Sequence, residues 1–153
     1  DHDRPLNAQG RQAAPVIGAW LAAREHVPDC VLCSSSRRTR ETLERMVETL
    51  PDLPGAEIET GLYHAAPAQI LGRLAHLPAT VRAPMVIGHQ PGLGSFARRL
   101  ARAPVRPRCA RAFEHFPTAG AAVLTLDIAD WSEIGFGLAS FVDFAKPREL
   151  VGS

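Results

Sequence analysis

The stretch from Pro84 to Leu93 combines a strand pattern, a tight turn and a helix start within ten residues. Met85 to Ile87 is an apolar run typical of a buried strand, and a glycine follows it. Pro91 then opens a helical pattern, because proline is tolerated at early helix positions. His89 therefore stands at the carboxyl end of a strand, beside the free N–H groups of a helix start. Ligands bind at such places in open α/β sheets, and a helix N-terminus favours anions.

Strand and helix patterns alternate along the rest of the chain, which predicts parallel βαβ units. Helices are expected to begin near Asn7, after the serines at 34–36, at Pro67 and at Pro91. Strands are expected over 30–33, 57–62, 85–87, 121–128 and 136–144, the last two as a hairpin. Because no helix separates these two, the sheet should be mixed. Residues 1–153 thus predict one domain, a three-layer α/β sandwich whose mostly parallel mixed sheet carries helices on both faces.

A second group of polar residues, from Ser34 to Thr42, follows the strand at 30–33. The carboxyl ends of this strand and of the strand at 85–87 should share one sheet edge, which brings the group towards His89. Hydroxyls, a helix start and clustered guanidinium groups suit a phosphate or a carboxylate. Arg37 and Arg38 oppose the helix dipole, and a bound anion would relieve that conflict. The pattern alone equally fits a solvated charged face. For His89 taken alone, a structural or capping histidine is the commoner outcome.

Composition excludes several other functions. The net charge of +1 creates no global field for nucleic acid or membranes, and aromatic residues for base stacking are scarce. No apolar run is long enough to span a bilayer. Cys30 and Cys33 fit a C-x-x-C motif, but they would face opposite sides of a strand, and no second ligand pair follows at zinc spacing. We expect no metal or other cofactor, and the sparse cysteines suit the reducing cytoplasm.

Taken in order, these segments resemble the histidine phosphatase superfamily. The resemblance is carried by Arg4-Pro5-Leu6-Asn7 with Gly10, Ser34-Ser35 through Arg38 to Thr42, and Gly88-His89-Gln90-Pro91-Gly92. Two further segments are similar to its small bacterial branch, the SixA-like phosphohistidine phosphatases: Phe116-Pro117-Thr118 and the Lys146-Pro147 ending. The resemblance implies a phosphoglycerate mutase-like fold and a metal-independent phosphatase.

The resemblance also implies a mechanism. In this superfamily a histidine attacks phosphorus and becomes phosphorylated, and water then releases phosphate. Two arginines and a second histidine hold the phosphoryl oxygens. By motif, Arg38 matches one of these arginines and His89 the second histidine, with Ser34 expected to contribute to phosphate binding. Arg4 would lie near the pocket mouth, on the substrate side. Positioning and preorganised positive charge would then supply most of the catalysis.

The chain departs from the superfamily pattern at the nucleophile. There the first strand ends in an Arg-His pair, and no such pair occurs in this sequence. We therefore expect the nucleophile and its strand to lie upstream of Asp1. The alternative is a catalytically dead homologue that binds phosphate or a partner. A sheet without that inner strand would leave unpaired backbone groups and an open core.

A second departure concerns the leaving group. Larger relatives carry a glutamate general acid after the third strand, but Gly61 to Ala65 contains no carboxylate here. The imidazole of a phosphohistidine leaves more easily than an alkoxide does, so a phosphohistidine protein is the favoured substrate. A small phosphorylated molecule is the alternative. His64 is a candidate substitute donor on the substrate side, although a surface or structural histidine is the commoner outcome.

The segment from Arg98 to Arg111 holds six arginines and no acidic residue. Such a segment would dock an acidic partner or steer a phosphorylated substrate. A solvated helix face and loop are the simpler interpretation.

Overall fold

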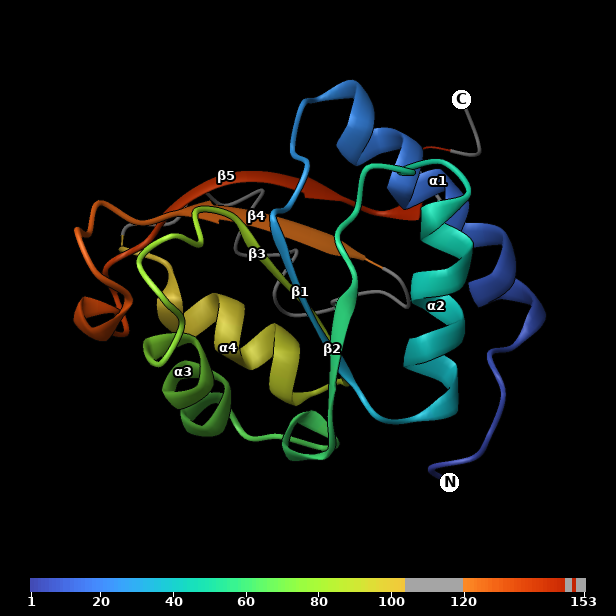
Figure 1. Ribbon diagram of the computed structural model, residues 1–153, viewed down its shortest axis with the longest axis horizontal. Coiled ribbons are helices and arrows are strands. Elements are labelled where there is room, and N and C mark those ends of the chain that lie inside the picture. Colours follow the sequence, from blue (N-terminus) through green and yellow to red (C-terminus); the bar gives the residue numbers. More distant parts are fainter. Residues whose placement is uncertain (104–119, 148–149, 151–153) are drawn as a thin grey trace.

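The computed structural model describes residues 1–103, 120–147 and 150 (Figure 1). The α-helices are α1 (Ala8–Ala23), α2 (Arg37–Val47), α3 (Pro67–Ala75) and α4 (Gly92–Leu100). The strands are β1 (Cys30–Ser34), β2 (Ala56–Glu59), β3 (Pro84–Ile87), β4 (Ala121–Thr125) and β5 (Ser140–Ala145). Two short 3-10 helices are η1 (Thr60–Leu62) and η2 (Trp131–Glu133). The strand expected over 57–62 is therefore shorter, because its second half turns into η1.

Strands β1, β2 and β3 form a parallel sheet with β1 in the centre. Val31 is paired with Ala56 of β2 and with Met85 of β3. Helix α2 connects β1 to β2 and α3 connects β2 to β3, as parallel neighbours require. All three carboxyl ends therefore lie at one edge of the sheet. The N-terminus of the chain lies near the same edge (Figure 1).

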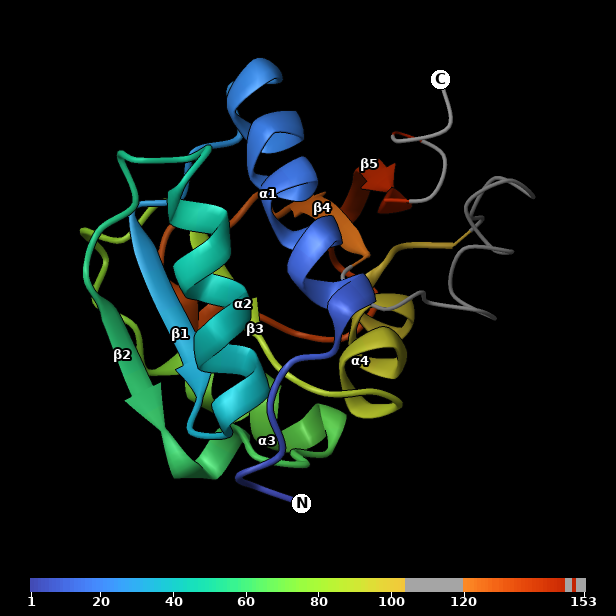
Figure 2. The same ribbon diagram turned by 90° about the vertical axis from the view of Figure 1, so that its right-hand side faces the viewer.

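Helices cover both faces of the parallel sheet (Figure 2). Successive side chains of a strand point to opposite faces, and β1 shows the consequence. Val31 and Cys33 are fully buried in a cluster with α1 and α2, whereas Leu32 is fully buried in a cluster with α3 and α4. The predicted α/β fold with helices on both sides of a parallel sheet is thus confirmed.

Strands β4 and β5 pair antiparallel, so the expected hairpin is confirmed with shorter strands. These strands form a sheet of their own. Within residues 1–103 and 120–147, no backbone pairing joins them to β3, which differs from the single mixed sheet that we predicted. A cavity of about 1490 Å³ lies here and is lined by all of β3 and all of β4. We call it the inter-sheet cavity.

The inter-sheet cavity accounts for the exposure of β3. The apolar run from Met85 to Ile87 was expected to be buried, and Ile87 is buried as expected. Met85 and Val86 are only half-buried, and both line the cavity. The edge of β3 opposite β1 is therefore paired with no described strand.

Local capping explains where the helices begin. The Asn7 side chain accepts a hydrogen bond from the Gly10 backbone N–H at 2.8 Å, as predicted for an N-cap. Of the three serines after β1, Ser36 caps α2 by accepting from the Thr39 N–H. Helix α3 begins at Pro67 and α4 follows Pro91, as expected.

Some sequence features fall outside the described residues. They are Cys109, the 116–118 segment and most of the arginine-rich stretch that begins at Arg98. In the part of the chain that is described, no helix combines the length and the apolar character needed to cross a membrane.

Candidate active site

Three residues predicted from the sequence converge at the carboxyl edge of the parallel sheet. His89 follows β3, Ser34 ends β1, and Arg38 lies in the first turn of α2. The Arg38 Nη2 donates to His89 Nδ1 at 3.0 Å, and Ser34 Oγ lies 2.7 Å from His89 Nε2. The serine is fully buried and the arginine side chain is 19% exposed. The parallel strands thus bring these groups together from segments about fifty residues apart.

The contacts of His89 determine its protonation. A guanidinium only donates hydrogen bonds, so the Nδ1 that receives Arg38 carries no hydrogen. The neutral ring then carries its hydrogen on Nε2 and donates it to Ser34. Burial and the positive Arg38, with smaller effects of His64 and His2, together lower the pKa of His89 to about 4. His89 is therefore neutral at pH 7 until an anion arrives.

This arrangement differs from a serine nucleophile with its histidine base. In such a pair the ring nitrogen facing the hydroxyl accepts its proton, and a third group, often a carboxylate, orients the opposite N–H. In His89 the nitrogen facing Ser34 already carries the hydrogen, and a guanidinium stands where the carboxylate would be. His89 is thus not placed to act as the base of Ser34, and the guanidinium beside it suits the binding of an anion.

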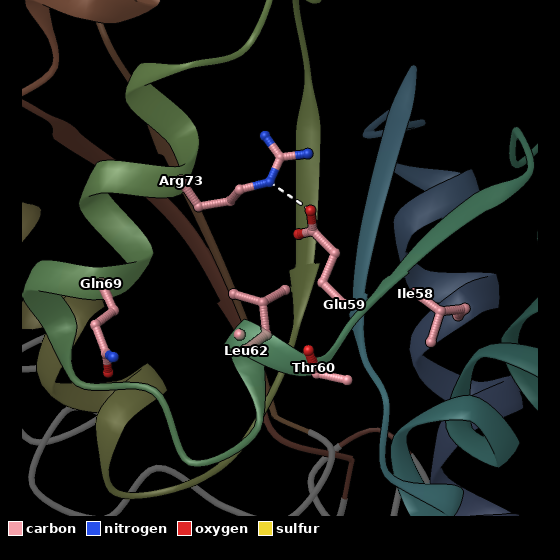
Figure 3. A pocket seen from close by; sticks show the side chains of 7 residues that line it. Ile58, Glu59, Thr60, Leu62, Gln69 and Arg73 are labelled. Carbon is pink, nitrogen blue, oxygen red and sulfur yellow. Dashed lines mark hydrogen bonds and ion pairs between the residues drawn. The ribbon is translucent and has the colours of Figure 1, made fainter.

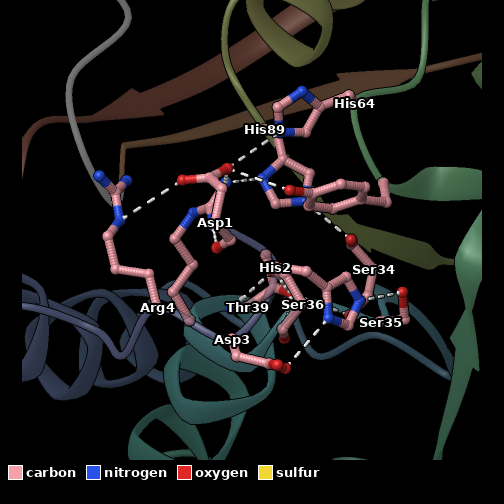
Figure 4. Close-up of polar contacts among 12 residues, drawn as sticks. Asp1, His2, Asp3, Arg4, Ser34, Ser35, Ser36, Thr39, His64 and His89 are labelled. Atoms are coloured by element: carbon pink, nitrogen blue, oxygen red, sulfur yellow. Dashed lines mark hydrogen bonds and ion pairs between the residues drawn. The ribbon is translucent and has the colours of Figure 1, made fainter.

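A carboxylate of the chain itself shows where an anion is held. Asp1 Oδ2 lies 3.5 Å from Arg38 Nη2, 3.5 Å from His64 Nε2 and 3.0 Å from the Tyr63 hydroxyl that donates to it. Arg4 Nε lies 3.8 Å from the other oxygen of Asp1 (Figure 4). Four potential donors from three segments therefore surround one negative group.

The loop after η1 forms the outer wall of the site. The Tyr63 ring centroid lies 5.2 Å from that of His89 and 4.2 Å from that of His64. His64 has a φ of 54°, a left-handed conformation that is uncommon outside glycine. A Cβ built on Gly92 would overlap the carbonyl oxygen of Ala65. The loop packs directly against the first residue of α4, and only a glycine leaves room for it there.

Of the clustered arginines after β1, only Arg38 contacts His89. Arg37 is exposed and pairs with Glu41 at 3.4 Å, and the Arg40 Nε donates to the carbonyl of Ser35. The interpretation as a solvated charged face therefore describes Arg37 and Arg40, whereas Arg38 lies against His89.

Several contributors to the site were not identified from the sequence. Asp1 and Tyr63 bring the groups described above, and His2 Nε2 lies 2.9 Å from the Ser35 hydroxyl. The carbonyl of His2 also accepts from the Arg37 N–H, which fixes the N-terminal segment over the start of α2. No sequence pattern marks these residues, because their positions depend on tertiary contacts.

A second, separate recess of about 610 Å³ lies between β2, η1 and α3 (Figure 3). Its charged residues neutralise one another: Arg73 donates to Glu59 and, at 2.7 Å, to Glu57. The other carboxylate oxygen of Glu59 is buried without a hydrogen-bond partner among the described residues. These ion pairs attach α3 to the outer strand β2, so Arg73 is not available to an anionic substrate.

The cysteines of β1 show no feature of a reactive site. Cys33 is buried, and burial raises the pKa of its thiol to about 11. Across the described residues, no cluster of three or more histidine, cysteine, aspartate or glutamate side chains is placed to hold a metal ion.

Curated proteins of two mycobacterial species are similar to this chain in sequence. Uncharacterized proteins of two Mycobacterium tuberculosis strains are 37% identical over 97% of this chain and 92% of their own length. An uncharacterized Mycobacterium leprae protein is 30% identical over 97% of the chain and 89% of its own length. No family model matches the chain.

Similar solved structures share the fold over nearly the whole chain. A proposed phosphohistidine phosphatase SixA from Nakamurella multipartitia is 28% identical, with a TM-score of 0.83 over 96% of this chain and 87% of that one. The protein histidine phosphatase SixA complexed with tungstate is 27% identical, with a TM-score of 0.78 over 98% and 88%. A proposed SixA from Agrobacterium tumefaciens is 25% identical, with a TM-score of 0.77 over 96% and 86%.

Proposed function

Because this chain belongs to the SixA branch of the histidine phosphatase superfamily, we propose that it is a metal-independent phosphatase that removes the phosphoryl group of phosphohistidine. The observation that carries the proposal is the joining of Arg38, His89 and Ser34 at the carboxyl edge of the parallel strands. Tungstate, which is bound in one of the similar structures, is a tetrahedral oxyanion like phosphate.

The proposed site binds the phosphoryl group by replacing the Asp1 carboxylate. Arg38 already points at that carboxylate, so its guanidinium faces the place where phosphoryl oxygens would be held. The negative charge of the phosphoryl group favours the protonated ring of His89, whose Nδ1 then no longer accepts from Arg38 and donates to the anion instead. Charge that develops on the transferred group is thus met by fixed donors.

The nucleophile is proposed to lie on a strand upstream of Asp1, since no Arg-His pair occurs in residues 1–153. The inter-sheet cavity offers the space: its 1490 Å³ exceed the roughly 300–1,000 Å³ of typical small-molecule pockets. Its two sides are β3 and β4, and no pairing between these strands is present in the described residues. A strand that fills it and leads into Asp1 would end at the carboxyl edge, beside His89 (Figure 1).

The proposed reaction has two steps. The nucleophilic imidazole attacks phosphorus, the bond to the leaving group breaks, and a phosphohistidine intermediate forms. Water then attacks the intermediate and releases phosphate. The covalent intermediate divides one difficult displacement into two easier ones.

Phosphohistidine is the favoured substrate because the wall of the site carries no carboxylic acid. The loop from Gly61 to Ala65 has none, and Glu59 is engaged by Arg73. A protonated imidazole leaves without further help, whereas an alkoxide requires an acid. A second candidate, a small phosphomonoester, is favoured by one observation, the placement of His64 beside the site.

The test uses the encoded protein with its natural N-terminus, after its intact mass and N-terminal sequence are measured. Phosphate release from a phosphohistidine peptide is followed in the presence of EDTA, with ³¹P NMR of an acid-labile phosphoenzyme as the second readout. We expect turnover. Tungstate binding without turnover would favour the binding homologue, and the absence of both would contradict the anion site itself.

A further inference from the structure

We propose that His64 protonates the leaving oxygen of a phosphate ester, an inference that rests on the proposed phosphatase function. The ring of His64 lies 5.2 Å from the ring of His89, on the outer wall of the site. Its side chain is 58% exposed, whereas Ser34 and Arg38 form the buried side. A phosphoryl group held by Arg38 and His89 would therefore point its leaving atom towards the solvent side, where His64 stands.

The position of His64 is held by several contacts. Its left-handed backbone, with φ at 54°, is unfavourable for a side chain with a Cβ, and such conformations cluster at functional sites. Tyr63 packs against both His64 and His89, and Ala65 rests on Gly92. The loop is therefore fixed to the site on both sides of His64.

The chemistry of His64 suits this role. Its Nε2 lies 3.5 Å from Asp1 Oδ2, so this nitrogen points into the anion site. The other groups facing it are the Tyr63 ring and the His89 ring, with Arg38 beyond His89. Histidine both gives and takes protons near neutral pH, which neither an arginine nor a tyrosine does readily. When a phosphoryl group replaces Asp1, the Nε2–H is left facing the leaving atom.

In the first step the bond from phosphorus to the leaving oxygen of the ester breaks, and its electron pair stays on that oxygen. Protonated His64 gives its Nε2 proton to the same oxygen and becomes neutral, while the proposed upstream imidazole forms the new P–N bond. In the second step water attacks phosphorus, the P–N electron pair returns to the imidazole, and neutral His64 takes a proton from the water.

The experiment measures turnover by the encoded protein on phosphate esters whose leaving groups differ in pKa, from p-nitrophenyl to phenyl to alkyl. The variant is His64→Asn, because asparagine tolerates the left-handed backbone. His76→Asn is the matched control: this exposed histidine lies at the end of α3 and contacts the Gly72 carbonyl. Tungstate binding to each variant checks that the anion site is intact.

We expect His64→Asn to lower turnover of the alkyl ester by about 10²–10⁴ and that of the p-nitrophenyl ester little, because only the poor leaving group needs the proton. Losses independent of the leaving group, or none, would overturn the role of His64 alone. A wild-type protein that hydrolyses neither these esters nor phosphohistidine would contradict the proposed function and this inference with it.

Discussion

Replacement of Arg38 by alanine tests the candidate site directly, because this side chain contacts both His89 and the Asp1 carboxylate. The guanidinium is mostly buried and already oriented, so its loss removes a preorganised donor. Removing one such donor typically costs about 10²–10³ in turnover. We therefore expect Arg38→Ala to lower turnover of a phosphohistidine peptide by that factor while the fold is retained.

The same variant has a second readout that activity alone does not give. Arg38 is the largest cause, after burial, of the lowered pKa of His89. Its removal should raise that pKa from about 4 towards the ordinary value of 6.5, which an NMR titration of the His89 ring measures. Arg38→Lys keeps the charge without the planar fork, so an intermediate loss of turnover is expected.

The control is Arg37→Ala, one residue away on α2. Arg37 is exposed and pairs with Glu41, so turnover and the His89 titration should stay close to those of the wild type. Equal losses in the two alanine variants would show that only general positive charge matters. Wild-type turnover in Arg38→Ala, with an unchanged His89 pKa, would refute the assignment of Arg38 to the site.

Sulfate stays a dianion over this pH range and favours the protonated form of His89, so its affinity should rise as the pH falls from neutrality towards about 4. Calorimetry should show this rise in the wild type and a flatter dependence of affinity on pH in His89→Gln. An identical pH profile in both would contradict the linkage. Gly92→Ala should destabilise the protein by about 1–3 kcal/mol in urea unfolding, since the new methyl meets the Ala65 carbonyl. Gly72→Ala, with open space around it, should instead stabilise by up to about 1 kcal/mol, and equal effects would refute the packing argument. Ser34→Ala should cost about 1–3 kcal/mol, because it removes the hydrogen-bond partner of His89 Nε2; unchanged unfolding would contradict that role.

The pairing of His89 with Arg38 was predictable because it follows from topology. Each residue follows a short apolar run within a few positions, and parallel strands place their carboxyl ends at the same edge. The helix starts at Asn7 and Ser36 were predictable for a similar reason, since capping depends on side chains close in sequence.

Other features depend on contacts that local patterns do not encode. Tyr63 and Asp1 are sixty-two positions apart and meet only because η1 and the N-terminal segment reach the same sheet edge. The roles of Arg37 and Arg38 differ by one helical position, which decides whether a side chain faces β3 or solvent. The sequence did not predict that Met85 is only half-buried. An apolar run indicates that a strand can be buried, but it does not indicate which elements pack beside that strand.

The open side of β3 and the candidate site are parts of one feature. β3 lines the inter-sheet cavity along its length and is followed by His89 at the cavity's end. The proposed upstream strand would therefore pair with β3, cover Met85 and Val86, and bring its nucleophile to Arg38 in the same step. Because buried backbone groups require partners, pairing of this strand would stabilise the sheet as well as complete the site. A homologue that only binds phosphate would have to fill the cavity in another way, so the unfolding free energy of the encoded protein, and not only its turnover, distinguishes the two proposed functions.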